Sequence, residues 1–362
     1  MDGAVRRKKY AVILTTYGEV EDVTIGNLWP SSRKILRAVT RQIVHIPAAL
    51  IYFIADYRST KHFIKWKLNH YQSSLLAVTR AQRDRLREVL ASRKSDLLST
   101  IDVDVSDAYY FVLPSLEEKL QQLQYHYDGV VVVPMIPVES AFSCGIACQM
   151  VIDRYGESSF SQVRVLSKLW SDERLHHLYA DYLFGQIAPD LLQKKQSGGR
   201  IGLVLVIHGT LVKDQAGNPP TLFTGYPETM AFFAAMQHSI MADPRNIFTR
   251  IMQGCINHSR GGEWTPDTIE KALAEFKAQG YDGVVMFPYG FFADNSETEY
   301  DARKQLDAAA FPLSQYLRCS NDDPEFIEWL SGKVLDGLQA LNNLQAGLQT
   351  LECHPEKETK QR

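Results

Sequence analysis

The chain contains a duplicated segment, and this repeat constrains the fold more than any other feature of the sequence. The motif "YDGVVVVP" at residues 127–134 returns as "YDGVVMFP" at residues 281–288. Each copy follows an amphipathic stretch that begins with a proline, "PSLEEKLQQLQYH" from Pro114 and "PDTIEKALAEFKAQG" from Pro266. A proline followed by Ser or Asp suits the start of a helix, and apolar residues recur at helical spacing. The repeat therefore predicts two similar halves, each with a helix that leads into a buried strand.

Two further stretches predict strands of the same buried type. Residues 10–18, "YAVILTTYG", and residues 201–210, "IGLVLVIHGT", are apolar runs rich in β-branched side chains. Such runs suit strands that are covered on both faces, as in a parallel sheet. Helical patterns lie between the strands, so the order is β-α-β-α. We therefore predict an α/β fold with two similar Rossmann-like, doubly wound halves, parallel sheets and a cleft between the halves.

The predicted domain boundaries follow from this repeat. The first half spans residues 8–168 and the second half spans residues 169–314. We expect residues 315–350 to pack back on the first half. The charged composition of residues 351–362 predicts a disordered tail.

Ligands of doubly wound folds bind beyond the carboxyl ends of the strands, which directs attention to four strand ends. These are Tyr17-Gly18, the segment after Pro134, His208-Gly209 and the segment after Pro288. If the two halves face each other, all four strand ends converge on one cleft.

His208 is the first candidate for chemistry at this cleft. A histidine that ends a strand and precedes a glycine would leave the sheet and serve as a base or a metal ligand. The alternative is a core histidine bonded to a backbone carbonyl. The position at a strand end favours the functional interpretation.

A carboxylate-rich segment follows Pro288 and supplies the second candidate group. Glu297 and Asp301 are four residues apart, so on a helix their carboxylates share one face. Like charges at this spacing cost stability unless a cation or a proton relieves them. A solvated acidic helix is the ordinary explanation, but a helix that starts at the predicted cleft favours transient metal binding or proton transfer. The sequence has neither a GxGxxG fingerprint nor a GxxxxGK[ST] loop.

Charge and cysteine content exclude some classes of protein. The formal net charge of −3 lacks the basic excess of nucleic-acid-binding proteins. The apolar run near the N-terminus is too short for a signal peptide, so we expect a cytoplasmic protein. Scattered cysteines fit a reducing compartment. Cys144 and Cys148 have a spacing that would suit two metal-binding thiolates on one helix face, but buried free thiols are the favoured interpretation.

The apolar segment "IVHIPAALIYFI", residues 43–54, raises the question of a membrane. It is too short to span a bilayer, which takes roughly 18 or more apolar residues. The segment either contacts one face of a membrane, with Trp29, Trp66 and basic residues at the interface, or forms a buried core helix. The sequence leaves both alternatives open.

Six motifs in the order of one family resemble the ferrochelatases, which insert Fe²⁺ into a porphyrin in heme biosynthesis. "FFADNSETEYD" is similar to the family segment F-x-[SA]-D-H-x-E-x-x-Y-[DE], and "VLVIHGT" is similar to the strand that holds the catalytic histidine. The other four motifs are "PMIPVESAFSCG", "NHSRGGEWTPDTIEKAL", "LRCSNDDPEFIEWL" and "YQSSLLAVTRAQ". Together they extend the resemblance over nearly the whole chain.

The resemblance implies roles for individual residues. His208 and Glu297 match the catalytic histidine and glutamate, and Asp301 matches a further acid, so that these three are the implied metal ligands. The residues that the resemblance places at the porphyrin pocket are Tyr17, Ser140, Gly145, Trp264 and Asn295. Asn295 stands where the family has a second histidine, so one proton carrier of the family is missing.

The implied substrates are Fe²⁺ and either protoporphyrin IX or coproporphyrin III. Metallation removes two N–H protons from the macrocycle, so a base must stand over the ring while carboxylates relay protons or metal. We expect no tightly bound cofactor and no iron–sulfur cluster, because the cysteine spacing differs from the family's cluster pattern. Two alternatives are a non-catalytic tetrapyrrole- or heme-binding protein on the same fold, and a chelatase for another metal such as Ni²⁺ or Co²⁺.

Overall fold

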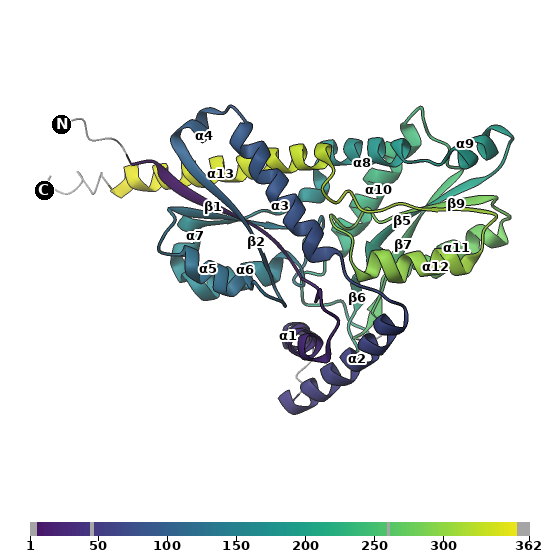
Figure 1. Ribbon diagram of the computed structural model, residues 1–362, viewed down its shortest axis with the longest axis horizontal. Coiled ribbons are helices and arrows are strands. Elements are labelled where there is room, and N and C mark those ends of the chain that lie inside the picture. Colours follow the sequence, from purple (N-terminus) through teal and green to yellow (C-terminus); the bar gives the residue numbers. More distant parts are fainter. Residues whose placement is uncertain (1–5, 44–46, 259–260, 353–362) are drawn as a thin grey trace, which may run out of the picture.

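Two parallel β-sheets organise the molecule (Figure 1). The first sheet contains β1 (Lys8–Thr16), β2 (Ile101–Tyr109), β3 (Gly129–Pro134) and β4 (Val163–Val165), and the second contains β5 (Ile201–His208), β7 (Arg250–Ile256), β9 (Gly283–Phe287) and β10 (Leu313–Tyr316). In the computed structural model, which describes residues 6–43, 47–258 and 261–352, the strand orders are β2-β1-β3-β4 and β10-β9-β5-β7. Every neighbouring pair in these two sheets is parallel, which confirms the predicted fold class.

Helices cover both faces of each sheet. On the first sheet, α5 (Leu116–Leu123) and α6 (Cys144–Tyr155) pack on one face, and α3 (Leu75–Ser92) and α13 (Pro324–Glu352) pack on the other. On the second sheet, α11 (Ile269–Ala278) and α12 (Arg303–Ala309) pack on one face, and α8 (Glu173–Gly185) and α10 (Tyr226–Ala242) pack on the other. Short elements complete the chain: α4 (Asp96–Thr100), η1 (Gly156–Ser158), α7 (Ser159–Gln162), η2 (Leu169–Ser171), α9 (Pro189–Gln196), and the antiparallel pair β6 (Leu211–Lys213) and β8 (Glu263–Trp264).

The duplicated motif performs the same structural task in both halves. In the first half, the carboxylate of Asp128 accepts a hydrogen bond from the backbone N–H of Lys9 at 2.7 Å. In the second half, the carboxylate of Asp282 accepts one from the backbone N–H of Arg200 at 2.8 Å. Each aspartate thus fixes the start of the neighbouring central strand, β1 or β5. The repeat is therefore a strand-pairing device.

The glycine of each motif allows a close contact inside the sheet. A Cβ atom at Gly129 would lie 2.7 Å from the ring of Tyr10, and one at Gly283 would lie 2.8 Å from Leu191. Tyr10 is fully buried and its hydroxyl is bonded to Gln345 of α13 at 2.7 Å, so its ring has little freedom to move. Packing therefore requires glycine at Gly129, whereas the atoms nearest Gly283 are the ends of the flexible Leu191 and Ile201 side chains.

One hydrophobic core is shared by the two halves. The inner faces of both sheets contribute to it, with Val12 and Val131 from the first sheet and Leu203 and Val285 from the second. Trp329 of α13 packs in the same core. The chain pairs through Tyr316 at the end of β10 in the second sheet, so residues 315–316 lie there and α13 then returns to the first half. Of the predicted tail, residues 351–352 end α13 and residues 353–362 lie outside the described residues.

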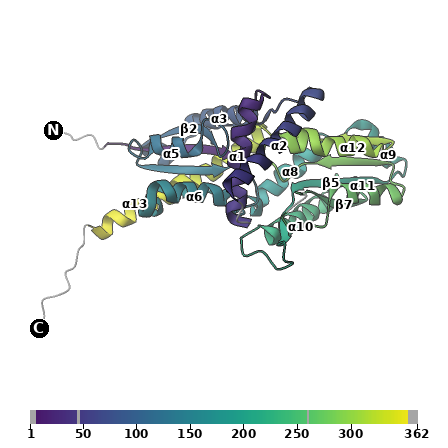
Figure 2. The same ribbon diagram turned by 90° about the horizontal axis from the view of Figure 1, so that it is seen from below.

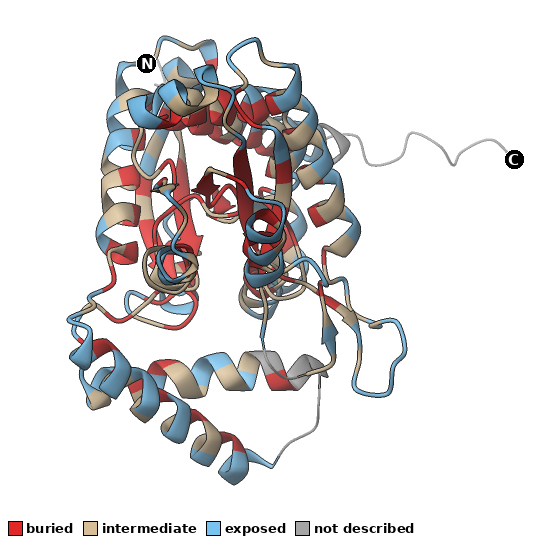
Figure 3. Ribbon diagram, turned by 90° about the vertical axis from the view of Figure 1, so that its right-hand side faces the viewer, coloured by how far each residue is buried: buried red, intermediate tan, exposed pale blue. Residues whose placement is uncertain are grey.

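Two helices, α1 (Ile25–Ile43) and α2 (Ala48–Leu68), lie apart from the sheets and cross the junction of the two halves (Figure 2). Of the segment 43–54, residues 44–46 lie outside the described residues, and residues 48–54 begin α2. Leu50 is 48% exposed and Phe53 is 70% exposed, and Figure 3 shows α2 largely exposed. The alternative of a buried core helix is therefore wrong for this part. Among the described residues, no helix is long and apolar enough to cross a membrane.

The packing at the repeat gives a first test. We expect Gly129→Ala to lower the free energy of unfolding by about 1–3 kcal/mol, because the new methyl group overlaps the fixed ring of Tyr10. Urea unfolding followed by circular dichroism measures this. Gly185→Ala is the matched control, because a Cβ atom there meets nothing within 4 Å. An equal response of the two variants would contradict the packing argument.

Candidate active site

A cleft of about 360 Å³ lies between the carboxyl ends of the two sheets, beneath α1 and α2. Six of the residues selected from the sequence line it: Tyr17, Ser140, His208, Trp264, Asn295 and Glu297. Gly145 and Asp301 are not among the described residues that line this cavity. The strand-end rule therefore located the cleft, while two of the residues that the resemblance assigned are outside its lining.

His208 ends β5 with one ring nitrogen fixed and the other available. Its Nδ1 lies 2.7 Å from the carbonyl oxygen of Gly209. A carbonyl only accepts hydrogen bonds, so Nδ1 carries a proton and Nε2 of the neutral ring is the basic atom. Nε2 lies 3.7 Å from Oε1 of Glu297. One ring nitrogen thus makes the backbone bond expected of a structural histidine, while the other faces an acid in the cleft.

Glu297 stands at the start of a π-helix, η3 (Ser296–Ala302). Short π-helical segments occur frequently at functional sites. Burial raises the pKa of the Glu297 carboxyl; the neighbouring Asp301 raises it further, while His208 lowers it. Glu297 therefore holds a proton more readily than an exposed glutamate does.

Asn295 caps this helix. Its Oδ1 accepts hydrogen bonds from the backbone N–H groups of Glu297 at 2.9 Å and Thr298 at 3.2 Å, and its Nδ2 donates to the carbonyl of Ala293 at 3.2 Å. The Thr298 hydroxyl in turn accepts from the backbone N–H of Asn295, which completes a capping box. Asn295 lines the cleft, but its polar atoms hold the helix that carries Glu297.

Asp301 lies one helical turn beyond Glu297 and pairs with α2. Its carboxylate lies 2.9 Å from Nζ of Lys65. Among the described residues, no group of three or more His, Cys, Asp or Glu side chains could hold a metal ion. The structure thus brings together His208 and Glu297, and places the third implied ligand, Asp301, in an ion pair beside them.

The two cysteines of α6 lie one turn apart on this helix. Cys144 and Cys148 are free and half-buried. Burial raises the pKa of Cys144 to about 11 and also raises the pKa of Cys148, so both thiols stay protonated at neutral pH.

Tyr17 joins the end of β1 to the loop that follows β3. Its hydroxyl donates to the carbonyl of Phe142 at 2.8 Å, and its ring stacks on Phe111 with centroids 6.1 Å apart. Burial, followed by the charge of Glu297, raises the pKa of the Tyr17 hydroxyl, so it stays protonated. Tyr17 therefore contributes a ring and a fixed loop to the cleft wall.

Ser140 and Gly145 shape the same loop. The backbone N–H of Gly145 donates to the carbonyl of Ser140 at 3.0 Å, and a Cβ atom at Gly145 would lie 3.0 Å from that oxygen. Ser140 is on the cavity side, and Gly145 permits the tight turn into α6 behind it. The role of Gly145 is therefore to position the wall of the cleft.

His258 and Glu19 are two of the acid–base residues of the cleft that sequence reasoning missed, and His62 of α2 is a third. His258 follows β7, and its ring centroid lies 5.0 Å from that of His208 and 4.9 Å from that of Trp264. Partial removal from solvent lowers the pKa of His258, with smaller contributions from His208 and Arg58, which favours the neutral ring. The strand-end rule would have selected His258 if "RIMQGCI" had been recognised as a strand.

Glu19 is the second missed residue. Its carboxylate lines the cleft and accepts hydrogen bonds from the Ser73 hydroxyl and from the hydroxyl and backbone N–H of Ser296. Burial raises the pKa of Glu19; these hydrogen bonds lower it, and Glu297 adds a smaller upward contribution. Glu19 thereby ties the end of β1 to the start of η3. Its place two residues after Tyr17 was the available signal.

Comparison with known proteins gives a family match over most of the chain. Residues 9–338 match the family model described as Ferrochelatase. A ferrochelatase of Herpetosiphon aurantiacus is 24% identical over 263 residues, which cover 69% of this chain and 81% of the relative.

Solved structures with a similar course of the chain include chelatases. CbiX, the terminal enzyme for biosynthesis of siroheme in denitrifying bacteria, has a TM-score of 0.46 at 12% identity and covers 90% of this chain and 98% of its own. SirB from Bacillus subtilis with Fe³⁺ has a TM-score of 0.45 at 9% identity, with coverage of 91% and 96%. DR2241 from Deinococcus radiodurans has a TM-score of 0.44 at 14% identity; the match covers 91% of this chain but only 54% of DR2241, about half its length.

The assignment rests on the family match, which covers both sheets, the cleft and the start of α13. The chain belongs to the ferrochelatase family, a family of tetrapyrrole metal chelatases.

Proposed function

We propose that this chain inserts a divalent metal ion, with Fe²⁺ as the physiological substrate, into a porphyrin in heme biosynthesis. The observation that carries the proposal is the pair formed by His208 and Glu297. Nε2 of the histidine and Oε1 of the glutamate lie 3.7 Å apart in the cleft. The bond from Nδ1 to Gly209 fixes the tautomer in which Nε2 is basic.

The chemistry of metallation uses such a pair directly. A free-base porphyrin loses two pyrrole N–H protons when its nitrogens bind M²⁺, so the products are the metalloporphyrin and two protons. In this proposal Nε2 of His208 accepts a proton from the ring, and Glu297 receives it or ligates the entering metal as water leaves. Asp301 extends the relay away from the cleft. No resident cofactor is needed for these steps.

A non-catalytic tetrapyrrole-binding protein is the second candidate, and one observation favours it. Asn295 replaces the second histidine of the family, and its side-chain oxygen and nitrogen are engaged in hydrogen bonds within the chain. A proton carrier is therefore missing at this position. Turnover decides between the two candidates.

The first measurement is anaerobic metal insertion by the purified protein. Fe²⁺ and Zn²⁺ are each offered to protoporphyrin IX and coproporphyrin III, with Ni²⁺ and Co²⁺ as further arms, and the porphyrin absorbance is followed. We expect His208→Ala and Glu297→Gln to lower the rate about 100-fold or more, because each removes a group that transfers a proton or binds the metal.

His126→Ala is the matched control, because this exposed histidine lies at the amino end of β3, opposite the cleft. If the wild-type protein binds porphyrin but does not metallate it, the protein is a tetrapyrrole carrier and not a chelatase. Failure to bind any tetrapyrrole would remove both candidates.

The capping role of Asn295 is tested by stability and activity together. Asn295→Ala should lower the free energy of unfolding by about 1 kcal/mol, because two backbone N–H groups lose their acceptor, and should slow insertion by displacing Glu297. Asn295→Asp retains the acceptor and should keep the stability. Chemical unfolding curves of both variants provide the measurement, and equal stabilities of Asn295→Ala and wild type would refute the capping role.

We further propose that the outer face of α2 contacts a membrane surface. One stripe of this helix holds exposed apolar side chains at helical spacing: Leu50, Phe53, Tyr57, Ile64 and Leu68. The same helix carries four basic residues, Arg58, Lys61, Lys65 and Lys67, against one acidic residue, Asp56. Apolar side chains beside basic ones suit an anionic lipid surface.

Liposome flotation tests the membrane contact. We expect the protein to float with vesicles that contain phosphatidylserine, and Phe53→Ser to reduce the bound fraction several-fold, because a 70% exposed phenyl ring is removed from the contact face. Phe160→Ser is the control, since Phe160 is 80% exposed on α7, away from α2. Equal binding of the two variants would argue against a role for α2.

A further inference from the structure

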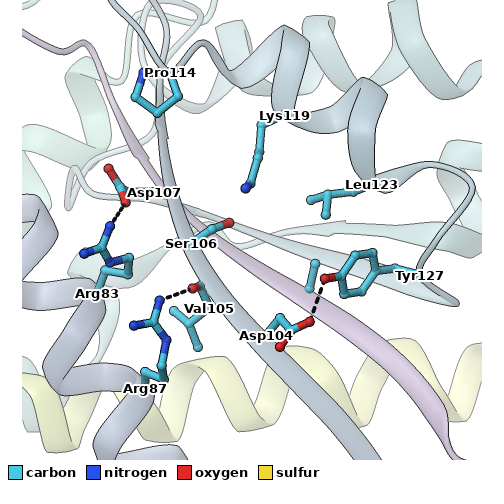
Figure 4. Close-up of a pocket in the computed structure, with 11 residues that line it drawn as sticks. Arg83, Arg87, Asp104, Val105, Ser106, Asp107, Pro114, Lys119, Leu123 and Tyr127 are labelled. Atoms are coloured by element: carbon cyan, nitrogen blue, oxygen red, sulfur yellow. Dashed lines mark hydrogen bonds and ion pairs between the residues drawn. The ribbon is translucent and has the colours of Figure 1, made fainter.

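A second cavity lies at the open edge of the first sheet, separate from the cleft (Figure 4). Its volume is about 470 Å³, within the usual range for small-molecule sites. The edge strand β2 forms the floor, α3 forms one wall through Arg83 and Arg87, and α5 forms the other through Lys119 and Leu123. None of the described residues that line this edge cavity also lines the cleft.

The two arginines of the edge cavity are already ordered. Arg87 donates to the carbonyl of Val105 at 2.7 Å and to Asp84 at 2.8 Å. Arg83 donates to Asp107 at 2.5 Å and to both carboxylate oxygens of Asp84 at 2.9 and 2.8 Å. A guanidinium has five N–H donors, so each arginine keeps donors that these bonds do not use. A ligand that bound them would immobilise little additional side chain.

The carboxylates of the cavity are balanced by neighbouring groups. Asp107 accepts from Arg83 and from the Tyr109 hydroxyl at 2.8 Å, and Asp84, which is not among the described lining residues, accepts from both arginines. Asp104 lies 3.0 Å from Nζ of Lys9 and accepts from the Tyr127 hydroxyl at 2.6 Å. These acids therefore do not require a cation from solution.

Among the described residues that line the edge cavity, Lys119 carries a positive charge that no carboxylate pairs with. Within residues 6–43, 47–258 and 261–352, neither its ammonium nor the hydroxyl of Ser106 has a hydrogen-bond or ion-pair partner. Lys119 is half-buried, and Figure 4 shows its side chain directed from α5 toward the floor of the cavity, where Ser106 lies. The acids of the cavity are already paired, so the ammonium of this lysine and the nearby hydroxyl donor are both available to an anion.

We propose that the edge cavity binds a small organic anion, with its carboxylate or phosphate group held by Lys119 and Ser106. The oxygens of either group accept from the ammonium and the hydroxyl, and the remaining donors of Arg87 extend the site. Pro114 at one end of the cavity, and Leu123 with the ring of Tyr127 at the other, supply apolar surface for the body of the ligand. The occupant is therefore an anion with an apolar portion, and the site is independent of the chemistry in the cleft.

Isothermal titration calorimetry with defined probes tests this assignment. Phenyl phosphate and benzoate distinguish the two anionic groups on the same apolar body, and benzyl alcohol is the uncharged probe. We expect at least one anion to bind the wild-type protein, Lys119→Gln to weaken that binding about tenfold or more, and Ser106→Ala to weaken it less. Lys195→Gln is the matched control, because Lys195 is a half-buried lysine of α9 in the other half.

The results for these variants and probes either support or overturn the anion site. Selective loss in Lys119→Gln, with an unfolding midpoint equal to that of wild type, supports the site, and the tighter probe identifies the anionic group. If the midpoint of Lys119→Gln falls, the decision passes to Ser106→Ala, which removes one hydroxyl only. The proposal is overturned if neither anion binds, if benzyl alcohol binds as tightly as the anions, or if Lys119→Gln and Lys195→Gln behave alike.

Discussion

The hydrophobic core between the two sheets is the interaction on which the cleft depends. Both sheets turn one face to this core, and Trp329 of α13 and Phe232 of α10 pack in it. Because the inner faces of both sheets and the helices that cover them share this core, Tyr17 and His208, at the ends of β1 and β5, line one cavity. Two separate cores would not fix the first half over the histidine of the second. Glu19 adds a polar tie between the halves, since it bonds Ser296 at the start of η3.

The features that could be predicted from sequence are those that local pattern decides. Buried strands carry continuous apolar runs, so the parallel sheets and the strand-end position of His208 followed from the chain alone. The features that were missed depend on residues far apart in sequence. Asp301 pairs with Lys65, 236 residues away, and the carboxylate of Glu19 is bonded to Ser296, 277 residues away. The exposure of residues 48–54 could not be predicted either, because the same apolar run occurs in buried core helices and in helices with an apolar surface.

Asn295 shows why a departure from a family pattern needs its structural context. In the sequence, Asn295 stands where the family pattern has a histidine, which suggests that one proton carrier is missing. In the fold, its oxygen accepts hydrogen bonds from the backbone N–H groups of Glu297 and Thr298, which orients the helix that presents Glu297 to the cleft. The cleft has two further acid–base groups close to the pair, the neutral ring of His258 and the carboxyl of Glu19. The departure therefore changes the set of acids and bases around His208 without removing the support of Glu297.

Helix α2 connects the chemistry of the cleft to the outside of the molecule through its two faces. One face turns Ser59, His62 and Trp66 toward the cleft, while the opposite face carries the exposed apolar stripe. Lys65 holds the helix to η3 through Asp301, but both side chains of this ion pair are more than 40% exposed, so it contributes at most about 1 kcal/mol. The ring of Trp66, which is buried in a cluster with Leu28 of α1, therefore contributes more to holding α2 in place than this ion pair does. In the proposed function a tetrapyrrole enters the cleft that this helix lines, so the helix proposed to contact a membrane is also part of the cleft wall.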